Sequence, residues 1–214
     1  MNIKPILFST EMVQAILEGR KTQTRRIIKP QPKEGIITTA FDFKKGFYAS
    51  KIKIEENPDR FEITKLFKPK YQTGDILWVR ESFAKPPIYA FGVKYIYKAG
   101  FNESICGWKP SIHMPKEAAR IFLEVTNVRV ERLQDISEDD AIAEGIEIID
   151  YAESILAVFK NYNLKEKKGT LYPRLSFRTL WEKINGEDSW NANPWVWVYE
   201  FKVVEKPKDF THEH

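Results

Sequence analysis

The sequence predicts an α+β protein: a small, strongly curved mixed β-barrel with short peripheral helices and long inserted loops. Most apolar segments alternate with period two, as half-buried strands do. The segment 120–133 alternates on one face and then shifts parity near Thr126–Asn127, which indicates a bulge that lets a sheet curl. Residues 194–204 are apolar on both faces, so we expect them to form a central strand.

The first elements are a short strand and a capped helix. The apolar run at 4–8 suits a strand, and Ser9 or Thr10 can cap a helix whose apolar positions recur at spacings of three and four. Gly19 stands where a helix end favours a left-handed residue. Residues 22–28 then resume as a strand.

The later elements follow the same two periodicities. A hairpin is expected over 45–67, around the turn-forming letters ENPD, with further strands at 76–83 and 93–99. Two helices are expected, one capped at Ser137 and stopped by Gly145, and an amphipathic one over 174–184.

We expect one domain over residues 1–205, followed by a flexible tail at 206–214. The segments near 30–70, 86–118 and 147–173 are interpreted as inserts, because none has enough apolar pattern for a core of its own.

Composition narrows the class of protein. Hydrophobic residues at 43% and aromatic residues at 14% indicate a folded globular chain. No stretch approaches the roughly 20 apolar residues that span a bilayer, and no signal peptide is indicated. Cys106 is the single cysteine, and the three histidines are His113, His212 and His214. We therefore expect a cytoplasmic protein with no internal disulfide, no metal site and no cofactor.

The net charge of +4 is unevenly distributed. Residues 1–70 carry 15 basic and 8 acidic side chains, whereas residues 134–214 carry 10 basic and 16 acidic ones. This asymmetry is typical either of a side that faces a polyanion or of two oppositely charged halves packed against each other.

The densest basic stretch is EGRKTQTRRIIKP, residues 18–30. Arg20 and Lys21 follow a predicted helix, where cations complement the negative end of the helix dipole by about 0.3–1 kcal/mol each. That explanation does not reach Thr24, Arg25 and Arg26, which continue the stretch into a predicted strand.

A second interpretation of the same stretch gives Lys21 and Thr24 a chemical role. Residues three apart face opposite ways in a regular strand, so the two converge only if Lys21 still belongs to the turn. A desolvated lysine beside a threonine hydroxyl would then be a plausible base and nucleophile.

Glu144 is an unusual carboxylate, because it falls in the last turn of its predicted helix. A negative charge there meets the negative end of the dipole, which is mildly destabilising. Such a placement suits a general acid–base, although an exposed glutamate is also a good helix former.

Trp78, Arg80 and Glu81 form a third candidate group within GDILWVRESF. Trp78 could stack on a base, and Arg80 could hold a phosphate or a carbonyl oxygen. The alternative is that Trp78 belongs to the core and that Arg80 and Glu81 form a surface pair.

The segment Gly19-Arg20-Lys21-Thr22-Gln23-Thr24-Arg25-Arg26 resembles the signature of the ASCH-domain proteins, a branch of the PUA-like β-barrel superfamily, and particularly the longer phage and prophage members. Their hallmark is Gly-x-Lys-x-x-Glu-x-Arg, so Thr24 replaces the glutamate. The small bacterial ASCH enzymes that hydrolyse N4-acetylcytidine carry a similar GRKTxTxR stretch. The similarity to those enzymes covers core blocks near 5–28, 71–83, 120–146 and 194–204.

The resemblance implies a cleft that binds RNA or a nucleoside, with Lys21, Thr24 and Glu144 as the catalytic set. Glu144 enters through the match of SEDDAIAEGI to the family's later acidic helix. Arg26 or Arg80 would hold the substrate. Arg20 and Arg25 are expected to be either dipole partners or phosphate contacts. A non-catalytic RNA-binding module, a single-strand ribonuclease and an accessory phage protein that acts through protein contacts remain the alternatives.

Overall fold

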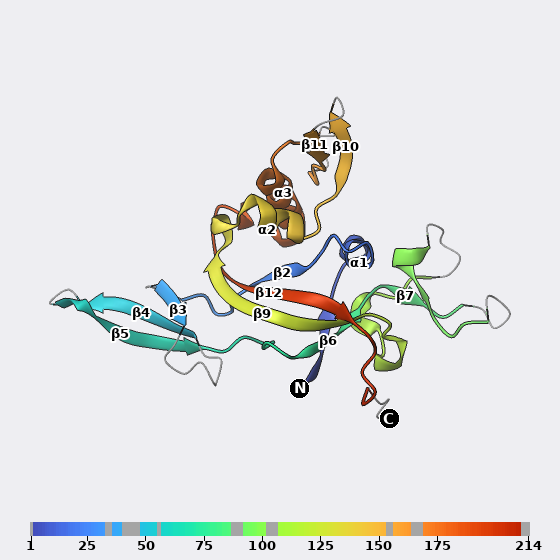
Figure 1. The fold of residues 1–214 in the computed structure, drawn as a ribbon, viewed down its shortest axis with the longest axis horizontal. Coiled ribbons are helices and arrows are strands. Elements are labelled where there is room, and N and C mark those ends of the chain that lie inside the picture. The colour runs from blue at the N-terminus through green and yellow to red at the C-terminus, as the bar shows by residue number, and fades with distance from the viewer. Residues whose placement is uncertain are drawn as a thin grey trace.

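The computed structural model describes residues 2–32, 36–39, 48–54, 57–86, 92–101, 107–152, 156–163 and 169–210. A mixed five-stranded sheet forms its centre (Figure 1). In spatial order the strands are β1 (Ile3–Leu7), β6 (Ile76–Arg80), β9 (Phe122–Arg132), β12 (Trp195–Val204) and β2 (Gln23–Ile27). β1 is parallel to β6, and the other neighbours are antiparallel.

The two strongest strand predictions are confirmed. β12 lies between β9 and β2, as a central strand does, and its two faces are apolar because each packs against a different core. Its register with β9 shifts between Glu200 and Phe201, which pair with Asn127 and Val125, so Thr126 has no partner in this ladder. This is the bulge expected near Thr126–Asn127, and it bends the two longest strands of the sheet together.

The sheet does not close into a barrel, contrary to the predicted architecture. β1 and β2 are its edges and do not pair with each other in the described part of the chain. Pro5 in β1 lacks an N–H donor, as is usual in an edge strand. The Pro5 carbonyl accepts a hydrogen bond of 2.7 Å from the Tyr71 hydroxyl. A side chain therefore occupies the position where the N–H of a further strand would bond.

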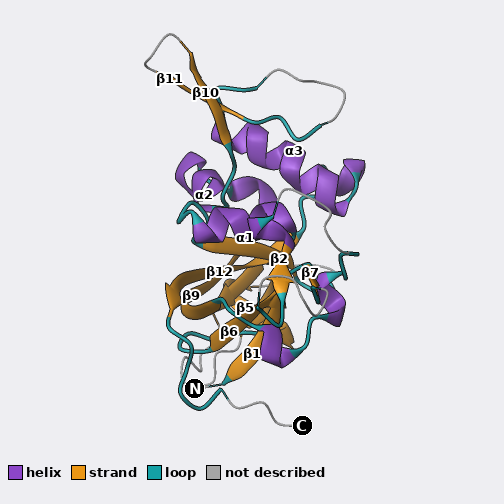
Figure 2. Ribbon diagram, turned by 90° about the vertical axis from the view of Figure 1, so that its right-hand side faces the viewer, coloured by secondary structure: helices purple, strands orange, loops and turns teal. Residues whose placement is uncertain are grey.

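Three α-helices lie together on one side of the main sheet (Figure 2). They are α1 (Thr10–Leu17), α2 (Glu138–Ala143) and α3 (Pro173–Asn185). Ser9 and Ser137 cap α1 and α2, because their hydroxyls accept backbone N–H bonds from Met12 and Asp140, as the sequence predicts. None of the helices that the structure describes has the length and apolarity needed to cross a bilayer.

The expected inserts carry small sheets that project from the centre (Figure 1). The additional strands are β3 (Ile36–Thr39), β4 (Tyr48–Ile54), β5 (Asn57–Phe67), β7 (Phe83–Ala84), β8 (Ile96–Tyr97), β10 (Ile148–Ala152) and β11 (Leu156–Phe159). The antiparallel pairing of β4 with β5 confirms the predicted hairpin over 45–67. Short 3-10 helices cover Lys98–Gly100, Ser111–His113, Lys116–Ala118, Leu133–Asp135 and Glu187–Ser189.

β12 separates two apolar cores. Trp197, Tyr199 and Phe201 face the core of the curved sheet, whereas Val196 and Val198 face the core beneath α2 and α3. This alternation follows from the period-two geometry of a strand. β2, which pairs with β12, therefore lies where the sheet meets the helical layer.

Phe210 lies within the predicted tail at 206–214. Phe210 is buried and packs edge-on against Phe122, with 4.8 Å between the ring centroids. Residues 211–214, which include His212 and His214, lie outside the described part, as does Cys106.

Candidate functional site

The start of β2 meets the end of α2, and this junction builds the site. Lys21 and Glu144 form an antiparallel backbone bridge, and the Thr22 N–H donates to the Ala143 carbonyl at 2.9 Å. The Lys21 N–H also donates to the Ala15 carbonyl of α1 at 3.0 Å. Two helices and a strand are thus tied together around Lys21.

The Lys21 ammonium group is fully buried at this junction. Its Nζ donates to Glu144 Oε2 at 2.8 Å and to the Glu144 backbone carbonyl, also at 2.8 Å. Burial lowers the pKa of the Lys21 amine, and the Glu144 carboxylate partly opposes this effect. The sequence predicted a dipole partner for the preceding helix, but Lys21 serves the C-terminus of α2 instead.

Arg20 has the same role on the outer side of the junction. Its Nη1 donates to the Gly145 carbonyl at 2.8 Å, and its guanidinium also pairs with Glu18. Arg20 therefore stabilises the turn after α2, about 125 residues away in sequence.

Arg25 is fully buried and holds three carboxylates. Its guanidinium donates to Glu144 Oε1 at 3.0 Å, to Glu131 Oε1 at 2.9 Å and to Asp140 Oδ2 at 2.9 Å. Burial favours the neutral form of Arg25, but Glu144 and the other two carboxylates outweigh it and raise its pKa. The Glu144 carboxylate is consequently held between two cations, Lys21 and Arg25.

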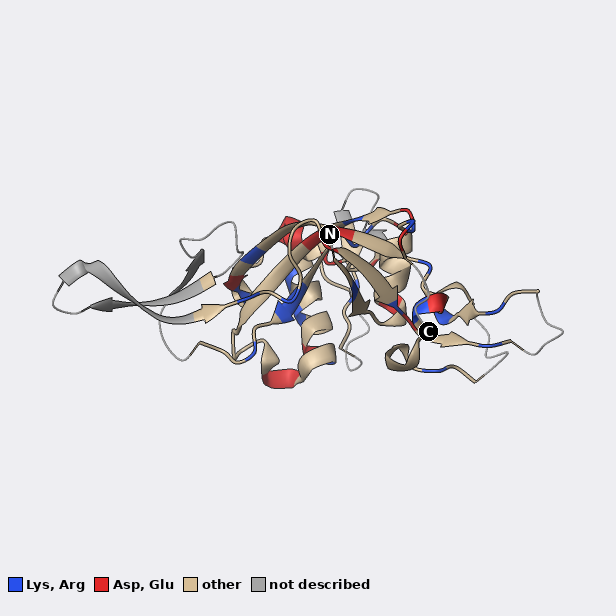
Figure 3. Cartoon of the chain, turned by 90° about the horizontal axis from the view of Figure 1, so that it is seen from below, with Lys and Arg blue, Asp and Glu red and all other residues tan. Residues whose placement is uncertain are grey.

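These ion pairs account for part of the uneven charge of the sequence. Basic side chains from the first third of the chain reach Glu131, Asp140 and Glu144, so oppositely charged parts of the chain pack against each other. Basic and acidic positions are accordingly interspersed through the centre of the molecule (Figure 3).

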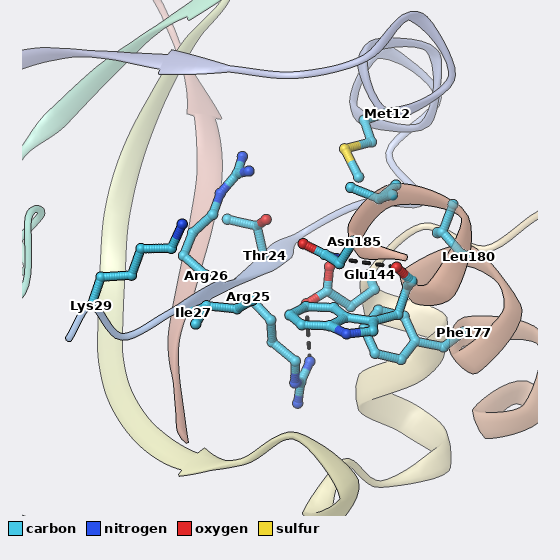
Figure 4. A pocket seen from close by; sticks show the side chains of 12 residues that line it. Met12, Thr24, Arg25, Arg26, Ile27, Lys29, Glu144, Phe177, Leu180 and Asn185 are labelled. Carbon is cyan, nitrogen blue, oxygen red and sulfur yellow. Dashed lines mark hydrogen bonds and ion pairs between the residues drawn. The ribbon is translucent and has the colours of Figure 1, made fainter. Parts of the chain in front are cut away.

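A cavity of about 250 Å³ opens beside Glu144, and we call it the Thr24 cavity. Figure 4 shows Thr24, Glu144 and Asn185 turned toward a common space between β2 and α3. No group in the described ranges hydrogen-bonds to the Thr24 hydroxyl. The lining residues are Met12, Thr24, Arg25, Arg26, Ile27, Lys29, Glu144, Phe177, Leu180, Trp181, Ile184 and Asn185.

Lys21 does not line this cavity and reaches it only through Glu144. Lys21 precedes β2, and its ammonium group is held at the end of α2 by the Glu144 carboxylate and carbonyl. The structure thus pairs Lys21 with Glu144, and Glu144 and Thr24 line one cavity that Lys21 does not line.

Arg26 lines the cavity but points away from Glu144 (Figure 4). Its Nη2 donates to the Leu7 carbonyl at 2.8 Å, and its guanidinium lies 5.3 Å from the centre of the Phe8 ring. Lys29, two positions beyond the strand, is exposed at the rim.

Trp78, Arg80 and Glu81 do not line the Thr24 cavity. Trp78 is only 8% exposed and packs in a core with Phe210. Arg80 donates to the Ile112 carbonyl, so it is engaged elsewhere. Glu81 is buried and accepts two hydrogen bonds from Arg120, at 2.8 and 2.9 Å, rather than forming a surface pair with Arg80.

The wall that α3 contributes was missed by sequence reasoning. Phe177, Trp181 and Asn185 recur at a spacing of four on that helix, which identifies a common face but not the strand it covers. Among the residues that the structure describes, no group of three or more His, Cys, Asp or Glu side chains is placed to bind a metal ion.

Gly145 controls how closely the end of α2 approaches β2. Its φ is +86°, and an added Cβ would lie 2.7 Å from the Lys21 Cβ and 2.9 Å from the Ala15 Cβ. Gly145→Ala is therefore expected to add an overpacking cost of about 1–3 kcal/mol to the cost of a strained backbone.

Gly19→Ala is the matched control for that change, because Gly19 has φ +75° and nothing within 4 Å of an added Cβ. It should cost only about 1–2 kcal/mol. Urea denaturation of both variants measures the difference. Equal losses would contradict the close approach of Gly145 to Lys21.

Asp140 is expected to make stability depend on pH in the acid range. Burial would raise its pKa, but Arg25 and Arg129 together hold the pKa of this carboxyl below its ordinary value of 3.8. The stabilisation is thus complete above the unfolded value and is lost as pH falls through the lower folded value.

Urea denaturation over a series of acid pH values measures this loss. Asp140→Asn should flatten the decline in unfolding free energy below about pH 4. Asp188→Asn, at an exposed position, is the control and should leave the decline as it is. The same slope in Asp140→Asn as in the unmodified protein would contradict the assignment.

No family model matches the chain, and no curated protein matches it. An ASCH domain from Lactobacillus crispatus JV V101 has a similar structure, with 14% identity and a TM-score of 0.39 over 96% of this chain and 81% of that one. Protein EF3133 from Enterococcus faecalis V583 gives 13% identity and a TM-score of 0.40 over 100% and 86%. At these values neither structure assigns a function to the chain.

Proposed function

We propose that the Thr24 cavity binds the base of a nucleoside or of RNA and hydrolyses an N-acyl group on a cytosine-type base. The observation that carries this proposal is the position of Glu144, which the fold brings from 123 residues away to Lys21 and into the wall of the cavity that Thr24 lines. A carboxylate and a hydroxyl at one cavity are the groups that acyl transfer needs.

The shape and lining of the cavity suit a base. Its volume of about 250 Å³ is small enough to select a single ring with a short substituent. Phe177 and Trp181 provide aromatic surface for stacking. Asn185 can both donate and accept hydrogen bonds at the edge of a base.

The proposed reaction uses Glu144 as the proton carrier. Glu144 accepts the proton of the Thr24 hydroxyl while Thr24 Oγ bonds to the acyl carbon. The C–N bond then breaks, and the proton passes from Glu144 to the leaving amine of the base. Water, with Glu144 again as the base, hydrolyses the acyl–threonine ester to a carboxylic acid and free Thr24.

Lys21 acts through Glu144 in this proposal and is a positioning residue. Its buried ammonium group fixes the carboxylate, and Arg25 fixes the other carboxylate oxygen. Arg26 supplies a positive charge at the rim of the cavity, where it can face a polar group of the substrate.

A second candidate function is binding without catalysis. The specific observation in its favour is that both oxygens of Glu144 already accept hydrogen bonds from cations. In that case the Lys21–Glu144–Arg25 network only holds α2 on β2, and the cavity binds a base of single-stranded RNA.

Incubation of the purified protein with N4-acetylcytidine separates the two candidates. The proposed hydrolase releases cytidine and acetate, which chromatography detects, and Lys21→Ala should abolish the release. Binding of N4-acetylcytidine without any release of cytidine would leave the binding function and exclude the hydrolase.

A further inference from the structure

A second cavity, of about 400 Å³, lies in the gap between the two sheet edges β1 and β2. We call it the basic cavity, because Arg26, Lys29, Lys68 and Lys70 line it and no aspartate or glutamate does. Its remaining lining residues are Ile6, Leu7, Ile27, Tyr71, Trp197 and Tyr199.

The basic cavity adjoins the Thr24 cavity. Arg26, Ile27 and Lys29 line both of them, so the end of β2 is their common wall. A ligand whose base occupies the Thr24 cavity would therefore have its next chemical group within reach of the basic cavity.

The segment that carries Lys68 and Lys70 is held in place by the sheet edges. The Lys4 ammonium donates to the Lys70 carbonyl at 3.1 Å, and the Tyr71 hydroxyl donates to the Pro5 carbonyl at 2.7 Å. The Tyr71 ring packs edge-on against Tyr199 of β12, with 5.1 Å between the ring centroids. The backbone that positions the two lysines is thus fixed before any ligand binds, which lowers the entropic cost of binding.

The pattern of burial directs both lysines outward. Phe67 and Pro69 are buried, whereas Lys68 and Lys70 are exposed, so the segment alternates as a strand does. A concave surface of this kind, lined by one sign of charge, attracts anions.

We propose that the basic cavity is a phosphate subsite and that the ligand is a single-stranded RNA whose base enters the Thr24 cavity. This deepens the proposed function and rests on it for the placement of the base. Single-stranded RNA fits because a base can enter a cavity only when it is unstacked from its neighbours. A free nucleotide offers the same phosphate chemistry, and the test separates the two.

The test compares Lys68→Gln/Lys70→Gln with Lys206→Gln/Lys208→Gln. The control pair has the same spacing and exposure, lies outside both cavities, and includes a lysine over an aromatic ring, as Lys70 is over Tyr71. The probes are N4-acetylcytidine, cytidine 5′-monophosphate and a short fluorescent single-stranded RNA that contains N4-acetylcytidine. Affinity for each probe is measured over a range of salt concentrations.

For the RNA, loss of two phosphate contacts should weaken binding roughly 25-fold at about 0.1 M salt and reduce the slope of log affinity against log salt by about 1.4. The control pair should keep the affinity and slope of the unmodified protein. Equal RNA affinities in the two double variants would overturn the subsite. RNA that binds no tighter than cytidine 5′-monophosphate would overturn the assignment to a strand.

The outcome for the subsite is distinguishable from the outcome for the proposed function. If the subsite exists but the protein has no hydrolase activity, Lys68→Gln/Lys70→Gln binds RNA more weakly than the unmodified protein, and the unmodified protein releases no cytidine from N4-acetylcytidine. If only the hydrolase exists, cytidine is released and the double variant binds RNA as tightly as the control does.

Discussion

Replacing Glu144 with leucine is expected to lower the free energy of unfolding by about 3–5 kcal/mol, the usual cost of breaking a buried ion pair from one side. The Lys21 side chain is 0% exposed, and Glu144 provides both of its hydrogen-bond acceptors. Without the carboxylate, a buried ammonium group keeps only a backbone carbonyl as its partner. Equilibrium denaturation in urea measures the loss.

Two further variants make this expectation specific. Lys21→Met/Glu144→Leu should recover part of the stability, because it removes both charges of the Lys21–Glu144 pair while Arg25 keeps Glu131 and Asp140 as partners. Glu11→Gln, which breaks the exposed pair with Lys183, should cost less than about 1 kcal/mol. A loss in Glu144→Leu as small as in Glu11→Gln would show that the pair with Lys21 is not buried in solution.

Thr24→Val is expected to abolish the release of cytidine from N4-acetylcytidine while the protein stays folded. Valine has the shape of threonine, and it removes a hydroxyl that has no hydrogen-bond partner among the described residues, so little stability should be lost. The reaction loses its nucleophile. Turnover and the urea midpoint are measured on the same preparation.

Thr22→Val is the matched control. Thr22 lies two positions earlier in the same segment, is exposed, and does not line the Thr24 cavity. It should retain turnover. A Thr24→Val protein that still releases cytidine at the unmodified rate would remove Thr24 from the mechanism and leave a water as the attacking group.

Local pattern was sufficient for the parts of the fold that depend on neighbours in sequence. The caps at Ser9 and Ser137 and the bulge opposite Glu200–Phe201 all follow from short stretches. Closure of the barrel did not, because it depends on whether β1 and β2 meet across the molecule. Trp78 was ambiguous for a related reason: only the packing of Phe210, far along the chain, shows that the indole is in a core.

The candidate site was likewise predictable only where a local pattern marks a residue. Glu144 was suspected because a carboxylate at a helix C-terminus is unusual, and the structure explains its position by the Lys21 ammonium group beside it. The partners of Arg25 were not predictable, since Glu131 and Asp140 lie more than 100 residues away and no local pattern links them to β2. The face of α3 that covers the cavity was not predictable either, because no local pattern links α3 to β2.

A crystal structure of Thr24→Val bound to N4-acetylcytidine tests the central claim most directly, because this variant should bind the substrate without converting it. We expect the base to lie beside Phe177 and Trp181, with the acyl carbonyl next to residue 24 and near Glu144. A ligand bound outside the Thr24 cavity, or an empty cavity at saturating ligand, would contradict the account.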